Sequence, residues 1–207
     1  YLYASYSVKR FSGKNICKKM LKRECKLDEN LTIPLFSTIS RLTDQKGIDI
    51  LIDALKAILD THKLQFVLLG QGEKRYKDEF NNLAQTFPDK VKVFIGFDQP
   101  LAHRIESGSD FFIMPSKFEP CGLNQMYSLK YGTIPIVRRT GGLDDSVIDM
   151  TDNQDHANGI KFIEYSPAAL IRAIQKAIAI FENKPLLKFY RVNGMKADFS
   201  WNKSIIE

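Results

Sequence analysis

Short apolar runs alternate along the chain with longer segments in which apolar residues recur every three or four positions. Runs of this kind are typical of buried strands, and the three-to-four-residue spacing is typical of helices. The predicted strands lie at 35–40, 65–70, 91–96, 110–115, 134–137 and 159–162. The predicted helices lie at 13–25, 47–61, around Phe80 to Ala84, 101–105, 122–132, from Gly141 onward, 167–182 and 185–197.

The order of these segments predicts the fold class. Strands and helices follow one another with short connections, which is the pattern of a parallel sheet covered by helices on both faces. Several strands, such as 65–70, are apolar at consecutive positions, as strands buried on both faces must be. The sequence therefore predicts an α/β fold with a parallel sheet flanked by helices.

Length and composition favour one globular domain. The chain has 207 residues, of which 44% are hydrophobic, so we expect a single domain over 1–207. No apolar run approaches the roughly 18 residues of a membrane helix, and no signal peptide opens the chain. The chain begins at Tyr1 rather than at a methionine, so we expect it to be a piece of a longer protein.

The cysteines and histidines do not predict a metal site. None of them has metal-ligand spacing, and the odd number of cysteines without a secretory signal favours free thiols in a reducing compartment, which predicts a cytoplasmic protein. The residues concerned are Cys17, Cys25, Cys121, His62, His103 and His156.

The net charge of +6 comes largely from a basic run between Lys9 and Lys26. A nucleic-acid surface is one interpretation, but the run lacks the interleaved aromatic residues of a stacking platform. We favour a solvated helix face near a domain boundary, so neither a nucleic-acid nor a membrane partner is expected.

The segment 118–125 carries the strongest functional pattern. Glu119 and Gly122 lie where a predicted strand, a tight turn and a helix start meet. Open parallel sheets bind ligands at such junctions, and the free N–H groups of a helix start favour an anion. A carboxylate beside them can accept hydrogen bonds from hydroxyl groups, so this pattern predicts a site for a sugar joined to a phosphate.

A second loop, 40–47, follows the first predicted strand and leads into a helix. Arg41 and Lys46 flank it. Two cations at the carboxyl end of a strand suit a diphosphate, because arginine offers forked hydrogen bonds and lysine a compact charge. The alternative is an ordinary surface loop.

Three glycine-containing segments and one thiol are weaker candidates. Gly70 to Gly72 resembles part of a dinucleotide fingerprint, and we interpret it as a turn that passes close to a ligand. Phe97, after Gly96, either stacks on a nucleobase or belongs to the core. Gly141 and Gly142 either approach a phosphate or make a tight turn. A nucleophilic role for Cys121 is disfavoured, because no histidine lies near it in the sequence.

Four motifs in this order resemble the bacterial glycogen synthases and plant starch synthases. They are Ser-Arg-Leu-Thr-x-Gln-Lys-Gly at 40–47, Phe-Glu-Pro-Cys-Gly-Leu-Asn-Gln at 118–125, Lys-Tyr-Gly-Thr-Ile-Pro-Ile-Val-Arg-Arg-Thr-Gly-Gly-Leu at 130–143 and Asp-Phe-Ser-Trp at 198–201. The resemblance extends from Tyr6 to Trp201.

The resemblance implies the C-terminal, Rossmann-like half of a GT-B glycosyltransferase, which holds the donor. The family transfers glucose from ADP-glucose to the non-reducing end of an α-1,4-glucan, with retention and without a required metal or other cofactor. It implies that Arg41 and Lys46 bind the diphosphate and that Glu119 contacts the transferred glucose. It further implies that the backbone of Cys121, Gly122, Leu123 and Asn124 forms the sugar and phosphate cradle and that Phe97 lies beside the adenine. Gly96, Gly141 and Gly142 complete the predicted donor-binding residues.

Two departures from the wider transferase pattern limit the assignment. Many related retaining transferases carry a second glutamate eight residues after the first, where this chain has Tyr127, so the ribose contacts stay unassigned. The N-terminal domain with the acceptor site is absent from this chain, so the isolated domain is expected to be inactive, and the glucan would bind through that missing domain.

The alternatives are a UDP-sugar-dependent transferase on the same fold and a non-catalytic nucleotide-sugar-binding module. A plant source would imply a plastid location. A glucan phosphorylase is disfavoured, because no motif indicates bound pyridoxal phosphate.

Overall fold

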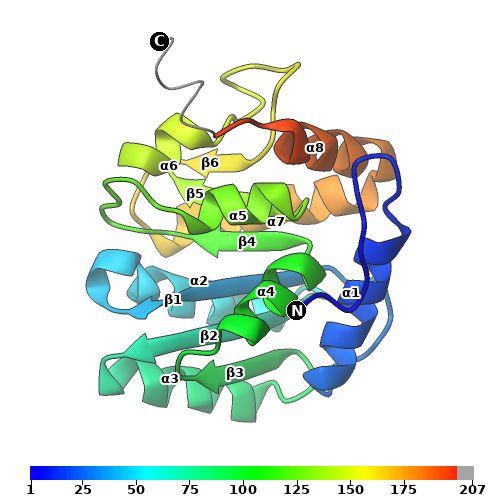
Figure 1. Ribbon diagram of the computed structural model, residues 1–207. Helices are drawn as coiled ribbons and strands as arrows, with labels where there is room; N and C mark the ends of the chain where they lie inside the picture. Colours follow the sequence, from blue (N-terminus) through cyan, green and yellow to red (C-terminus); the bar gives the residue numbers. More distant parts are fainter. Residues whose placement is uncertain (200–207) are drawn as a thin grey trace.

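The computed structural model describes residues 1–199, so Ser200 and Trp201 of the last motif lie outside the described residues. Six parallel strands form one sheet in the order β3-β2-β1-β4-β5-β6 (Figure 1). Their bounds are β1 Leu35–Leu42, β2 Gln65–Gly72, β3 Val91–Ile95, β4 Phe111–Met114, β5 Ile134–Arg138 and β6 Ile160–Phe162. This is a Rossmann-like arrangement, as predicted.

Eight α-helices in the described part alternate with the strands and cover both faces of the sheet (Figure 1). Their bounds are α1 Ser12–Glu24, α2 Ile48–Leu59, α3 Lys74–Thr86, α4 Gln99–Gly108, α5 Asn124–Lys130, α6 Gly141–Ser146, α7 Pro167–Glu182 and α8 Lys184–Lys196, with a short 3-10 helix, η1, at Asp44–Lys46. Asp98, Ser166 and Asn183 cap three of them, each just before a proline in the first turn. No helix in residues 1–199 is long and apolar enough to cross a membrane.

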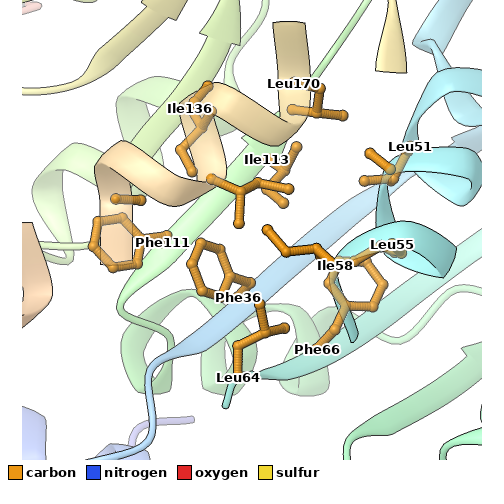
Figure 2. Close-up of a cluster of buried hydrophobic side chains, with 14 of the residues drawn as sticks. Phe36, Leu51, Leu55, Ile58, Leu64, Phe66, Phe111, Ile113, Ile136 and Leu170 are labelled. Atoms are coloured by element: carbon orange, nitrogen blue, oxygen red, sulfur yellow. The ribbon is translucent and has the colours of Figure 1, made fainter. Parts of the chain in front are cut away.

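The apolar residues of the strands and helices form two main hydrophobic clusters, one on each face of the sheet. On one face, Phe36, Phe66 and Phe111 pack with residues of α2 and α7 (Figure 2), and the same cluster includes residues of α3. On the other face, Leu35, Val67 and Leu69 pack with Leu21 of α1 and with Leu101 and Ile105 of α4. Burial of both faces explains the consecutive apolar residues in the central strands.

The prediction for the basic run was wrong for three of its lysines. Lys14, Lys18 and Lys22 of α1 are buried, whereas the apolar Ile16 in the same helix is 49% exposed. The lysines donate to backbone carbonyls, including those of Ser107 and Ile33. Neither a nucleic-acid surface nor a solvated face describes these three side chains.

Asp110 explains why buried cations are tolerated next to the sheet. Its carboxylate pairs with Lys18 and Arg191 at 2.6 Å each and accepts from the backbone N–H of Leu35. Although burial opposes ionisation, these two cations hold the pKa of Asp110 below its ordinary value. The cluster joins α1, β1 and α8 at the amino ends of the central strands.

Gly70 to Gly72 also differs from expectation. These residues continue β2 instead of forming a turn. A Cβ on Gly70 would lie 2.6 Å from the carbonyl oxygen of Ser40, and one on Gly72 would lie 2.3 Å from that of Leu42. The glycines therefore allow β2 to lie close to β1.

Candidate functional site

The strand order creates a crevice between β1 and β4. The chain proceeds outward from β1 through β2 to β3, then returns and proceeds the other way from β4. The loops that follow β1 and β4 therefore diverge, which is where such sheets bind ligands. A cavity of about 210 Å³ lies here, lined by residues of both loops, including Arg41, Lys46, Ser116 and Asn124.

The loop after β1 presents the two predicted cations at this cavity. Arg41 is exposed, and its guanidinium has no hydrogen-bond or ion-pair partner among residues 1–199. Lys46 ends the short helix η1 and is followed by Gly47 at φ 69°. A Cβ at Gly47 would lie 2.0 Å from the carbonyl oxygen of Pro115, so glycine is required for the two loops to meet.

Lys46, which lines the cavity, meets Glu119 of the loop after β4. Their side chains form an ion pair and are mostly buried, with 18% and 9% exposed. Ser116 Oγ donates to the same carboxylate at 3.4 Å. The structure thus joins two residues that are 73 positions apart in the sequence, one predicted for the diphosphate and one for the sugar.

Backbone contacts hold the two loops to each other. The N–H of Lys117 donates to the Gln45 carbonyl at 2.9 Å, and Gln45 Nε2 donates to the Phe118 carbonyl at 3.3 Å. These bonds fix the distance between the segments that carry Lys46 and Glu119. Gln45 and Ser116 were not identified from the sequence.

Gly141 and Gly142 support the Glu119 loop from below. The N–H of Gly142 donates to the carbonyls of Glu119 and Pro120, both at 3.1 Å. A Cβ on Gly141 would lie 2.2 Å from the Glu119 oxygen, and one on Gly142 would lie 2.0 Å from the Cys121 oxygen. Because the Gly142 N–H is used in these hydrogen bonds, the two glycines position the Glu119 loop.

The turn at 121–124 is shaped by Gly122 and Gln125. Gly122 has φ 71°, which favours glycine. The Gln125 side chain is fully buried and its Nε2 donates to the carbonyls of Cys121 and Gly122. Asn124 Nδ2 donates to the Ile39 carbonyl at 2.9 Å and so ties the start of α5 to β1. Sequence reasoning missed Gln125, although it belongs to the 118–125 motif.

The remaining candidates lie along the same edge of the sheet. Phe97 follows β3 and is 88% exposed, which excludes the core interpretation. Cys121 and Leu123 are exposed beside the cavity loop. Within residues 1–199, no group of three or more histidine, cysteine or acidic side chains could hold a metal ion.

Comparison with known proteins agrees with this geometry. Residues 22–185 match the family described as glycosyl transferases group 1. The chain is 46% identical over 204 residues to a glycogen synthase of Anaeromyxobacter sp. strain Fw109-5, covering 99% of this chain and 42% of that protein. It is 45% identical over 207 residues to a glycogen synthase of Thermosipho africanus, covering 100% of this chain and 42% of that protein.

A solved structure extends the similarity to three dimensions. The catalytic domain of starch synthase IV from Arabidopsis thaliana, bound to ADP and acarbose, superposes with a TM-score of 0.91 at 34% identity. The match covers 99% of this chain and 43% of that one. The chain thus spans about two fifths of the length of the relatives it matches.

Proposed function

The chain belongs to the group 1 glycosyltransferases, and from this membership we propose that it is the donor-binding domain of a glycogen or starch synthase. The proposed reaction transfers glucose from ADP-glucose to the non-reducing end of an α-1,4-glucan with retention, the glucan binding through parts of a longer protein. The observation that carries the proposal is that Arg41 and Lys46 line one cavity at the β1–β4 switch point and that Lys46 forms an ion pair with Glu119.

The proposed donor follows the carboxyl edge of the sheet. The diphosphate lies against Arg41 and Lys46, and the glucose lies within reach of Glu119. Neighbouring strands are about 4.8 Å apart, so β3 lies roughly 10 Å from β1. That span suits the reach of a nucleoside diphosphate, and it supports the exposed ring of Phe97 as the contact for the adenine.

The proposed chemistry depends on charge that develops on the departing ADP. Cleavage of the bond between the glucose carbon and the phosphate oxygen leaves negative charge on the diphosphate. Arg41 and Lys46 stabilise that charge, and preorganised donors of this kind contribute roughly 3–4 kcal/mol each to the transition state. Glu119 accepts hydrogen bonds from the glucose hydroxyls and orients the ring.

Calorimetric titration of the chain with ADP-glucose and with UDP-glucose tests the nucleotide. We expect ADP-glucose to bind at least about tenfold more tightly, a difference of about 1.4 kcal/mol. Equal or tighter binding of UDP-glucose would show instead a UDP-sugar transferase. Labelled glucose incorporated into glycogen by this chain at the rate of a complete synthase would contradict the assignment of the acceptor site to other residues.

A further inference from the structure

Two residues outside the cavity hold its loops from the opposite side. Arg138 ends β5, and Tyr165 lies between β6 and α7. The Arg138 guanidinium donates from Nε to the Ser116 carbonyl at 2.9 Å, from Nη2 to the Lys117 carbonyl at 2.5 Å and from Nη1 to the Ile163 carbonyl at 3.4 Å. These acceptors include two consecutive residues of the loop that leads to Glu119.

Tyr165 reaches the other loop. Its hydroxyl donates to Asp49 Oδ1 at 2.5 Å, in the first turn of α2, and lies 3.4 Å from the Asp44 carbonyl, at the start of η1. Burial and the hydrogen bond to Asp49 raise the pKa of Tyr165, so the hydroxyl stays a donor at neutral pH. Tyr165 thereby fixes the turn whose last residue is Lys46.

The two side chains also meet each other. The Arg138 guanidinium lies 5.8 Å from the centre of the Tyr165 ring, and the ammonium of Lys117 lies 5.7 Å from it. These distances are those of cation–π contacts. Arg138 forms no ion pair with a carboxylate among residues 1–199, and its guanidinium donates to three backbone carbonyls.

We propose, on the basis of the proposed function, that Arg138 and Tyr165 are positioning residues that set the separation of Lys46 and Glu119 for the donor. Each loop carries one of the two groups that meet the donor, and neither loop is part of a strand or a long helix at that point. The Arg138–Tyr165 pair holds both loops at once. Neither side chain lines the cavity, so each acts through the loop that it holds.

A double-mutant cycle on ADP affinity, measured by calorimetry with the 207-residue chain, tests the proposal. Arg138→Ala is expected to weaken ADP binding about tenfold, the effect of one hydrogen bond to a charged group. In a Lys46→Ala background, the same change is expected to alter affinity less than about threefold, because displacement of the Glu119 loop then changes its separation from no lysine. Additive effects, or an unchanged affinity for Arg138→Ala, would overturn the proposal.

Further variants separate positioning from loss of fold. Tyr165→Phe removes one hydroxyl and is expected to weaken ADP binding at least about threefold, near the low end for an ordinary hydrogen bond. Arg138→Lys is expected to recover little, because an ammonium cannot reproduce the fork. Arg104→Ala is the matched control. Arg104 donates to Glu24 at 3.0 and 2.9 Å, away from the cavity, and its loss should leave the affinity unchanged.

The outcomes distinguish this proposal from the one on which it rests. If the unmodified chain fails to bind ADP, both are overturned. If it binds ADP and Tyr165→Phe binds equally well while remaining folded, only the positioning role is overturned.

Discussion

Lys46, at the cavity wall, and Glu119 neutralise each other in an ion pair. A diphosphate that arrives between them would have to share the ammonium with the carboxylate and lie near a like charge. The glucose of a complete donor would offset this cost by donating hydroxyl hydrogens to Glu119, whereas ADP alone has no such group. We therefore expect the pair to favour the intact donor over the product.

Removal of the Glu119 charge should therefore affect ADP binding and glucose transfer in opposite directions. Glu119→Gln is expected to bind ADP about fivefold more tightly, since relief of a partly exposed charge interaction is worth about 1 kcal/mol, while glucose transfer by a complete synthase falls. Calorimetry with ADP measures the first effect. Glu182→Gln, at the exposed end of α7, is the control and should not change affinity. Weaker ADP binding by Glu119→Gln would show that the carboxylate assists the diphosphate.

Glu106 gives a residue-scale prediction for stability. It lies in α4 with 4% of its surface exposed, and burial raises its pKa from 4.5 to about 8. The charge of ionised Glu106 contributes to raising the pKa of Tyr6 and Tyr131. Between pH 4.5 and about 8 the folded state retains a proton that the unfolded state releases. The stability that protonated Glu106 contributes to the folded state is therefore fully present below pH 4.5 and is lost as the pH rises to about 8.

Glu106→Gln removes this dependence. We expect the difference in unfolding free energy between variant and unmodified chain to shift in favour of the variant by up to about 1.4 kcal/mol per pH unit across this window. Denaturant unfolding at pH 5, 6.5 and 8 measures it. A difference that stays constant with pH would contradict the assigned protonation.

At the scale of elements, α6 determines the position of the Glu119 loop through its first turn. From the sequence, Gly141 and Gly142 had two interpretations, a phosphate contact or a tight turn. The structure shows close packing against a neighbouring loop, which single-sequence reasoning could not find because the contact joins segments about twenty residues apart.

Gly142→Ala tests this packing. The new Cβ would lie 2.0 Å from the Cys121 carbonyl oxygen, so the loop must shift. We expect a loss of about 1–3 kcal/mol in stability, as for an overpacked site, together with weaker ADP binding. Thermal unfolding and calorimetry measure the two effects. Asp145→Ala, at an exposed position in the same helix, is the control. Normal stability and affinity for Gly142→Ala would mean that α6 does not hold the loop.

At the same scale, α1 shows why amphipathic patterns can mislead. Lys14, Lys18 and Lys22 recur every four residues and lie on a buried face. Their partners include Asp110 and the Ser107 carbonyl, which are about ninety positions away in the sequence. Lysines that recur on one helix face without acidic partners nearby in the sequence are predicted to be exposed to solvent. Their partners here come from distant segments that only the tertiary fold brings close.

At the scale of the whole molecule, the sequence predicted the strands, most helices and the edge where the site lies. Those features follow from local periodicity and from the rule that parallel strands end on one side. It did not predict that β1 and β4 are neighbours, or that Lys46 contacts Glu119, because pairing between distant segments has no local pattern. Arg138 and Tyr165 were missed for the same reason.

We propose that the loops after β1 and β4 bind the diphosphate through Lys46. Calorimetric titration of ADP into the unmodified chain, Lys46→Ala and Lys63→Ala tests it most directly. Lys63 carries the same charge at an exposed position just before β2, at the opposite edge of the sheet. We predict roughly 10- to 100-fold weaker binding for Lys46→Ala, the loss of a hydrogen-bonded charge on a phosphate, and unchanged binding for Lys63→Ala. Equal affinities for the two variants would contradict the account.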